Sequence, residues 1–336
     1  MVIKTYYINE THVLERYCSK TFELYFKDSS ICVLDIETTG ISPETSHFVL
    51  GSLLSFDEGG KALLRQYFAE GLSEEKALLV EYMEDAARFD VVLTYNGKGF
   101  DMPYLFSRMK KLGLDIDAAP YNLDLYLVLN GYSPLRKFLP NLRQKTVEDF
   151  MGFWHLRKDK ISGSQMPALY PKYRDLMLLH NSDDVLQLGR LLPVLEKVDF
   201  HRAMHVLGFP VITGTNKVHV KRIKLEGNSL NVSGIQTSCP VGFAHYGDAG
   251  GDCYIRFVRS PSTFEISFPL IKKSHAMVVD LLKLPFDMDG ELSSLPNYES
   301  GYLILKDGGD TNYHDINMLV KTFLVKILDN IPEDYS

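Results

Sequence analysis

Two carboxylates close together in the sequence, Asp35 and Glu37, have the residue types and the spacing for metal-ion chemistry. They stand two residues apart at the end of the apolar run 31–36, which predicts a strand buried on both faces. Side chains two apart on a strand point to the same face, so both carboxylates would converge on one spot. Buried like charges repel unless something positive lies between them, and a divalent cation meets that need. The alternative is that the two residues merely begin a turn.

A third carboxylate, Asp101, follows the predicted strand 90–95. Ligand sites of open α/β sheets gather at the carboxyl ends of the strands, so Asp101 is a candidate partner for the first two acids. An ordinary helix N-cap is the competing interpretation, because Asp101 directly precedes the predicted helix 102–112, with Pro103 in its first turn.

A predicted helix around 176–192 carries an imidazole and a carboxylate on one face, because His180 and Asp184 are four residues apart. A satisfied surface pair is the competing interpretation. Asp183 is an alternative ligand, rotated to the neighbouring position on the helix.

The elements that must position these residues form a recognisable order. Five apolar-rich runs predict strands, at 31–36, 48–54, 62–68, 90–95 and 121–125. The second and third are joined by a Gly-containing turn, and helices are predicted at 73–88, at 102–112 and between about 145 and 198. A meander of three strands followed by alternation indicates a mixed sheet with helices packed on it.

The texture of the sequence changes after about residue 205. Short β-rich runs dominate there, at 217–225, 229–236, 253–258 and 263–268, and one amphipathic helix follows, with an apolar stripe from Ile316 to Leu328. We therefore predict an N-terminal extension over 1–27, an α/β domain over 28–204, and a smaller, mainly β accessory domain over 205–336 closed by the terminal helix.

Composition limits the class of protein. The chain has 336 residues, 45% hydrophobic and 24% charged, which excludes a disordered, collagen-like or fibrous protein. No stretch approaches a membrane-spanning length, the first residues lack a signal-peptide core, and the four cysteines form no Cys-x-x-Cys pair. These features predict a cytoplasmic protein without a membrane partner.

The net charge of −7 argues against a protein that coats nucleic acid by bulk electrostatics. Residues 130–180 differ, because they hold nine Lys and Arg against four Asp and Glu, a local charge of +5.

Three motifs in this order resemble the DEDD 3′–5′ exonucleases, within the ribonuclease H-like superfamily. They are Asp35-Ile36-Glu37 on the first strand, Asn96-x-x-x-Phe100-Asp101 after the fourth, and Asp184 on a late helix. The stretches 145–148 and 160–163 are similar to the YprB-like subgroup of largely uncharacterised bacterial proteins. The resemblance covers about residues 28–198 and implies a ribonuclease H-like fold for them.

The resemblance implies that Asp35, Glu37, Asp101 and Asp184 bind two divalent metal ions, Mg²⁺ or Mn²⁺. Two such ions stabilise the attacking and leaving oxygens of a phosphodiester displacement, and carboxylate oxygens suit these hard cations.

One position departs from the family. The third motif is normally Tyr-x-x-x-Asp or His-x-x-x-x-Asp, whereas here His180 occupies the Tyr position, four residues before Asp184. A neutral imidazole at that place could serve as the general base. The substitution could equally mean altered or lost activity.

Residues around these motifs are candidates for binding substrate, namely Thr38, Asn96, Phe100, Asp124, Arg157, Lys158 and Lys160. Asp124 either supports the metal site or caps the helix that follows it. A basic strip for the phosphate backbone would add Arg136, Lys137, Arg143, Lys145, Lys172 and Arg174. Phe153, Trp154, Tyr170 and Tyr173 could stack unpaired bases. A solvated helix face with core aromatics is the alternative.

The leading prediction is therefore a two-metal-ion 3′–5′ exonuclease that trims single-stranded DNA or RNA. A catalytically weak nucleic-acid-binding module and a structure-selective endonuclease are the alternatives. The accessory domain would position substrate or mediate oligomerisation.

Overall fold

The computed structural model describes residues 1–8, 19–57, 60–115, 119–246 and 253–330. The chain divides into two compact units, Met1–Val198 and Asp199–Ser336. None of the helices within the described ranges is long and apolar enough to cross a membrane.

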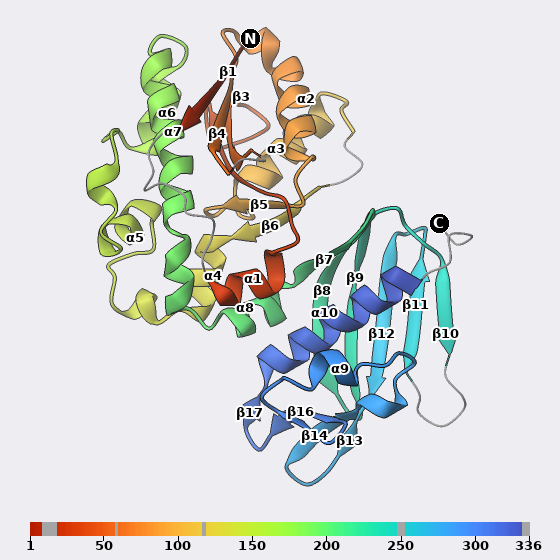
Figure 1. Ribbon diagram of the computed structural model, residues 1–336. Helices are drawn as coiled ribbons and strands as arrows, with labels where there is room; N and C mark the ends of the chain where they lie inside the picture. Colours follow the sequence, from red (N-terminus) through yellow and green to blue (C-terminus); the bar gives the residue numbers. More distant parts are fainter. Residues whose placement is uncertain (9–18, 58–59, 116–118, 247–252, 331–336) are drawn as a thin grey trace. The chain divides into compact units, whose positions relative to one another are not determined.

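The first unit is built on a six-stranded mixed sheet with the order β1-β4-β3-β2-β5-β6 (Figure 1). Strands β1 to β4 pair antiparallel, whereas β2, β5 and β6 run parallel to one another. The strands are β1 (Val2–Ile8), β2 (Ile31–Thr38), β3 (Phe48–Phe56), β4 (Ala62–Phe68), β5 (Val91–Thr94) and β6 (Tyr121–Asp124). The predicted mixed sheet is thus confirmed.

The first strand lies in the segment that the sequence analysis assigned to an extension over 1–27. Val2–Ile8 pairs along its whole length with β4 and forms an edge of the sheet. Helix α1 (Lys20–Phe26) follows, with Phe22, Tyr25 and Phe26 buried. Residues 9–18 of the predicted extension lie outside the described residues.

Helices pack on both faces of this sheet (Figure 1). On one face, α2 (Glu75–Ala86) and α3 (Asp101–Lys111) form a core with Cys32, Leu34 and Ile36 of β2. On the other face, α6 (Met166–Leu169) and α7 (Arg174–Arg190) pack against Val49 and Leu50 of β3. The remaining helices of the unit are α4 (Leu125–Tyr132) and α5 (Gln144–Phe150), with 3₁₀ turns at Leu72–Glu74, Pro134–Lys137, Trp154–Leu156, Gly163–Gln165 and Leu192–Lys197.

The alternation along β2 decides where its acids point. Because Leu34 and Ile36 face the core with α2 and α3, Asp35 and Glu37 face the side of the sheet that α7 covers. Tyr82 of α2 holds β2 from the opposite face of the sheet, because its hydroxyl donates to the backbone carbonyl of Asp35 at 3.1 Å. The ring lies so close to Gly51 of β3 that a Cβ atom there would stand 2.5 Å from it.

The parallel pairing of β2, β5 and β6 brings their carboxyl ends to one edge of the sheet. Glu37 lies near the end of β2, Asp101 begins the helix that follows β5, and Asp124 ends β6. The fold thus gathers three acidic positions that are far apart in the sequence.

The second unit is mainly β, as predicted. Its larger sheet is antiparallel, with the order β10-β11-β12-β9-β8-β7, and consists of β7 (Phe209–Thr213), β8 (Asn216–Glu226), β9 (Ser229–Ser238), β10 (Phe243–Tyr246), β11 (Tyr254–Val258) and β12 (Thr263–Pro269). A smaller sheet contains β13 (Ile271–Lys272), β14 (Ala276–Asp280), β15 (Tyr298–Glu299), β16 (Tyr302–Asp307) and β17 (Asp310–Thr311). The helical elements are α8 (Phe200–Leu207), a 3₁₀ turn at Leu281–Lys283, α9 (Asp289–Leu292) and α10 (Tyr313–Asn330).

Helix α10 buries the apolar stripe that the sequence predicts. Phe323 is fully buried, with its ring 4.7 Å from that of Phe268 on β12 and 5.5 Å from that of Phe286. The predicted terminal helix is therefore part of the core of this unit.

Candidate active site

Asp35 and Glu37 leave β2 on the face that α7 covers. Asp35 Oδ2 accepts a 2.6 Å hydrogen bond from Asn181 Nδ2. Glu37 Oε1 lies 3.6 Å from His180 Nε2. Asn181 is held in turn by the hydroxyl of Ser52 on β3, which donates to its Oδ1. Both acids therefore meet side chains of α7 that are fixed against the sheet.

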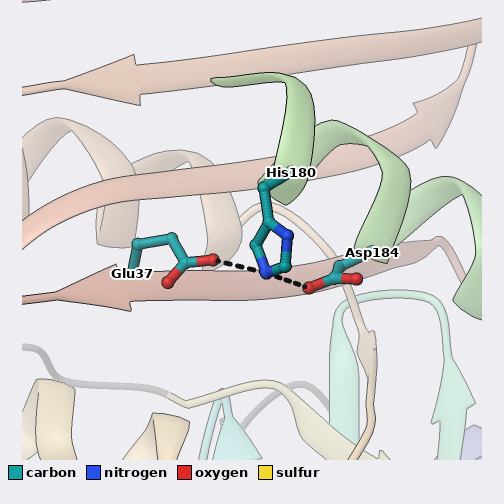
Figure 2. A group of neighbouring side chains, drawn as sticks. All are labelled: Glu37, His180 and Asp184. Carbon is teal, nitrogen blue, oxygen red and sulfur yellow. Dashed lines mark ion pairs between the residues drawn. The ribbon is translucent and has the colours of Figure 1, made fainter. Parts of the chain in front are cut away.

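Helix α7 presents an imidazole and a carboxylate to Glu37 (Figure 2). His180 Nε2 lies 3.2 Å from Asp184 Oδ2, and the two residues are one helical turn apart, as the spacing predicts. Glu37, His180 and Asp184 each offer one atom that could bind a metal ion, and these three atoms lie within 4.8 Å of one another. The His180 side chain is only 1% exposed, so it is part of the interior rather than a surface pair.

The fourth acid, Asp101, comes from α3, which packs on the face of the sheet opposite to α7. It is the first residue of α3, and Phe100 is the N-cap residue, in contrast to the N-cap alternative for Asp101. Asp101 is 6% exposed. Its charge acts on those of Asp35 and Glu37, which shows that the acids from β2 and α3 share one electrostatic environment.

Burial and mutual repulsion dominate the electrostatics of the site. Burial raises the pKa of Asp35 well above its ordinary value, and the charges of Asp184 and Asp101 add to this shift. Burial also raises the pKa of Glu37 well above its ordinary value, with Asp35 as the next cause. Burial raises the pKa of Asp101 to about 7. Ionisation of these carboxylates in the folded chain is therefore unfavourable, and a bound cation would reduce this free-energy cost.

Arg157 is a buried cation beside these acids. Its Nη1 lies 2.6 Å from Asp184 Oδ1, so Asp184 is held between Arg157 and His180. Its Nε and Nη2 donate to the two oxygens of Glu148 at 2.9 and 2.7 Å. Arg157 was predicted as part of a basic strip for substrate, but its side chain is only 1% exposed and is engaged by these two carboxylates.

A loop next to Arg157 supplies a second contact to the imidazole. Asp159 Oδ2 bonds to His180 Nδ1, and the Asp159 side chain is 2% exposed. Asp183 fixes this loop on α7, because its Oδ2 accepts from the backbone N–H groups of Lys158 and Asp159 at 2.6 and 2.5 Å. Asp183, the alternative ligand, is therefore directed to the loop.

Asp124 both caps a helix and supports the loop before Asp101. Its Oδ1 accepts from the backbone N–H groups of Tyr126 and Leu127 in α4, at 3.0 and 3.3 Å. The same carboxylate accepts from the N–H groups of Asn96 and Lys98 at 2.9 Å each. The helix-capping alternative describes the first pair of bonds, while the second pair shapes the turn that leads to Asp101.

The other candidate substrate residues lie around this edge. Thr38 is buried, and its hydroxyl donates to the carbonyl of Gly40 at 2.7 Å. Asn96 is exposed, at a positive φ of 65°. Phe100 is half-buried, with its ring 5.5 Å from that of Tyr104. Thr38 therefore shapes the turn after β2, and Asn96 is the most accessible of the three.

The predicted basic strip is partly exposed. The side chains in solvent are Arg136, Lys137, Arg143, Lys158, Lys160, Lys172, Trp154 and Tyr173, and the half-buried ones are Lys145, Arg174, Phe153 and Tyr170. Lys145 donates to the carbonyl of Ile161, and Tyr170 packs 5.9 Å from the ring of Phe68. The cations open to a phosphate backbone are thus fewer than the sequence suggests.

Sequence reasoning missed Asp159, Asn181 and Glu148. Asn181 stands three residues before Asp184, a spacing that places it on the same helix face and could have identified it. Asp159 lies between two lysines in a stretch interpreted as basic, and only the folded loop shows that it turns inward. Glu148 is fully buried, and its part is visible only once Arg157 is seen to enter the interior.

The residues present fit a divalent cation. Asp35, Glu37, Asp101 and Asp184 offer carboxylate oxygens, the ligands that Mg²⁺ and Mn²⁺ prefer. Burial, and after it repulsion between the acids, raises the pKa values of Asp35, Glu37 and Asp101, and a bound cation would offset both effects. The group could hold metal ions, and Glu37, His180 and Asp184 could share one of them.

The part of the chain that contains these residues is similar to a known protein family. Residues 32–195 match the model of the RNase_H superfamily. That match contains Asp35, Glu37, Asp101, His180 and Asp184.

Two archaeal proteins are similar in sequence to part of the chain. A protein named DNA polymerase from Methanocaldococcus jannaschii is 31% identical over 103 residues, which are 30% of this chain and 6% of the relative. DNA polymerase 1 from Aeropyrum pernix is 23% identical over 168 residues, which are 44% of this chain and 15% of the relative. The chain thus spans only a small part of the length of both relatives.

Two solved structures are similar at low overlap. The family B DNA polymerase from Pyrobaculum calidifontis has a TM-score of 0.42 and 20% identity, and the match covers 50% of this chain and 24% of that one. A structure described as the apo form of the nuclease has a TM-score of 0.34 and 21% identity, and covers 50% of this chain and 72% of that one.

Proposed function

We propose that this chain, in which residues 32–195 form a domain of the ribonuclease H superfamily, is a nuclease that hydrolyses phosphodiester bonds with two divalent metal ions. The finer proposal is a 3′–5′ exonuclease that acts on single-stranded DNA or RNA ends. The relatives named above are DNA polymerases, which makes DNA the first substrate to test.

The observation that carries this proposal is the convergence of four carboxylates from three elements. Asp35 and Glu37 come from β2, Asp101 from α3 and Asp184 from α7. Burial raises the pKa values of Asp35 and Glu37, and the charges of the other carboxylates in the group add to this shift. A fold with no use for a cation would gain stability from apolar or paired residues at these positions.

The residues of the chain divide the work. Asp35, Glu37, Asp101 and Asp184 would hold the ions, Mg²⁺ or Mn²⁺. Such ions, when bound, supply an activated water and stabilise the charge on the attacking and leaving oxygens of the phosphodiester. Arg157 holds Asp184 in place through its 2.6 Å contact with Oδ1. His180 lies beside Glu37 and Asp184, where it could serve as the general base only if its Nε2 is not bound to an ion.

Single-stranded nucleic acid is the substrate class that the surrounding surface supports. Lys158 and Lys160 are exposed on the loop that also carries Asp159, and each could neutralise a phosphate. Trp154 and Tyr173 are 36% and 44% exposed, enough for a base to stack on either ring.

The test is a cleavage assay on 5′-labelled single-stranded DNA and RNA with Mn²⁺, Mg²⁺ or EDTA. The wild type should give a metal-dependent ladder that shortens from the 3′ end. Asp101→Asn should give none, while the matched control Asp175→Asn, on the exposed side of α7, should cleave like the wild type. Loss of cleavage in both variants would remove the assignment of Asp101.

Circular single-stranded DNA separates the alternatives, because it has no end. Cleavage of the circle would replace the exonuclease proposal by an endonuclease that uses the same carboxylates. Binding of linear strands without cleavage, in any metal, would favour the binding module instead.

A further inference from the structure

The two ring nitrogens of His180 face different partners. Nδ1 bonds to Asp159, whereas Nε2 faces Asp184 Oδ2 at 3.2 Å and Glu37 Oε1 at 3.6 Å. The Asp159 carboxylate thus occupies Nδ1, and Nε2 is the ring nitrogen directed at the two acids.

Asp159 is rigidly held for this contact. Its own backbone N–H donates to Asp183 at 2.5 Å, and its Oδ1 accepts from the N–H of Ile161 at 2.9 Å. Both Asp159 and His180 are almost fully buried, so neither side chain has room to turn away. The chain thus fixes the orientation of the imidazole.

The close approach of Nε2 to two carboxylate oxygens requires a positive species between them. The lone pairs of Nε2 and of the carboxylate oxygens, at 3.2 and 3.6 Å, would repel unless a proton or a cation lies between them. Ligand atoms at adjacent positions around an ion bound at about 2.1 Å stand about 3 Å apart, close to these separations. An ion shared by the three donors would remove the repulsion.

We propose that His180 is a direct metal ligand through Nε2, together with Glu37 and Asp184, and that this nitrogen makes the centre prefer first-row transition-metal ions such as Mn²⁺ over Mg²⁺. Asp159 is a positioning residue that holds the other ring nitrogen. The inference rests on the proposed function only in that it places a divalent ion in the carboxylate group.

The chemistry of the ligands supports this preference. Mg²⁺ takes oxygen ligands almost exclusively, whereas affinities of sites with nitrogen ligands rise from Mn²⁺ through Co²⁺. Metal-binding imidazoles commonly donate their other N–H to a carboxylate, and loss of that carboxylate weakens metal binding by about 10- to 100-fold. His180 and Asp159 have this arrangement.

Electron spin echo spectroscopy of Mn²⁺ bound to the full chain, without nucleic acid, tests the ligand directly. The wild type should show nitrogen modulation from a coordinated imidazole, and this signal should change when the histidines carry ¹⁵N. Neither result requires cleavage activity. His180→Gln should lose the modulation, and Asp175→Asn should keep it.

Binding titrations with Mg²⁺, Mn²⁺ and Co²⁺ test the preference. The wild type should bind Mn²⁺ at least ~10-fold more tightly than Mg²⁺, and Co²⁺ more tightly still. His180→Gln should lose ~10-fold or more for Mn²⁺ with little change for Mg²⁺. Asp159→Asn should lose about 10-fold for Mn²⁺ while keeping the nitrogen modulation.

The outcomes separate this inference from the proposed function. Mn²⁺ bound without nitrogen modulation in the wild type, and with the same affinity in His180→Gln, would overturn His180 as a ligand while the carboxylate centre stands. In that case the positive group between the donors is a proton on the imidazole. No binding of any divalent ion to the wild type would overturn both.

Discussion

Two groups of buried residues in the first unit differ in how the negative charge within them is balanced. In the first group, Glu75 accepts from Arg108 Nε and Nη2 at 2.7 and 2.5 Å, from His47 Nδ1 at 2.7 Å and from the N–H of Phe48 at 2.8 Å. Burial acts to raise the pKa of Glu75, but these bonds outweigh it and lower the pKa below its ordinary value. The charge of Glu75 is thus balanced by groups of the protein itself, and no bound ion is needed.

The second group, Asp35, Glu37, Asp101 and Asp184, has the opposite balance. Burial raises the pKa of Asp35, Glu37 and Asp101. The buried cation beside them, Arg157, is shared between Asp184 and Glu148. The same fold that satisfies Glu75 completely leaves these acids with an excess of negative charge.

The contrast shows how much stability the proposed metal site gives up. A fully paired carboxylate adds to stability, whereas carboxylates held together without enough cations reduce it and are retained for binding or catalysis. Substitutions in the two groups should therefore have effects of opposite sign on stability.

Replacement of Asp101 gives the largest effect on activity. Asp101→Asn removes a proposed ion ligand, which is worth several kcal/mol of transition-state stabilisation, so we expect cleavage to fall by at least ~10³-fold. In EDTA at pH 8 the same variant should raise the free energy of unfolding by about 1 to 2 kcal/mol. Urea unfolding checks the second value, and a loss of stability would break the contrast between the groups.

Replacement of Arg108 gives the largest effect on stability. Arg108→Met leaves Glu75 buried without its main partner, and breaking a buried pair in this way costs about 3 to 5 kcal/mol. Lys110→Met, on the exposed side of the same helix, is the matched control and should change stability by less than about 0.5 kcal/mol. Equal effects in urea unfolding would show that Glu75 is not stabilised by its pairing.

The pH dependence of metal stabilisation gives an intermediate effect. The pKa of Asp101 is about 7 in the folded chain against an ordinary value of 3.8, so the folded state binds more protons between these limits. Without metal, this group therefore makes the protein less stable as the pH rises from about 4 to about 7.

Metal ions need the ionised carboxylates, so Mn²⁺ at 100 times its dissociation constant should add about 2.7 kcal/mol at pH 8 and clearly less at pH 5.5. Thermal unfolding with Mn²⁺ or EDTA at the two pH values measures this difference. An equal gain at both would contradict a proton-linked centre, and Asp101→Asn should weaken the dependence.

Reversal of exposed lysines gives the smallest effect. Lys158→Glu with Lys160→Glu should leave stability and metal affinity unchanged, because both side chains are exposed. Binding to single-stranded DNA should weaken, and the salt dependence of log K should become shallower by about 1 to 2. An unchanged salt slope would remove these lysines from the substrate path.

The order of elements could be predicted from the sequence because it depends on local patterns. The apolar run 31–36 and the Gly-containing hairpin over 48–68 identified three central strands, and the stripe from Ile316 to Leu328 identified the terminal helix. Strand β1 was missed, since Val2–Ile8 is an edge strand in which no side chain is fully buried.

The acids of the candidate site could be predicted because each stands at a fixed distance from the end of a strand or from another residue on a helix. The inward direction of Arg157 and Asp159 could not, because it depends on how an irregular loop packs on α7. Spacing alone does not tell a buried arginine from the exposed lysine beside it.

The attachment of that loop has a consequence for following the site in solution. The backbone N–H groups of Lys158 and Asp159 both donate to one carboxylate, that of Asp183. Their exchange with deuterium therefore reports whether the loop is packed on α7. Slow exchange at these two amides would mark molecules in which Asp159 and Arg157 are both in place. The exchange rates of these two backbone hydrogens thus measure how often the loop is in place beside the carboxylates, and the measurement needs no substrate.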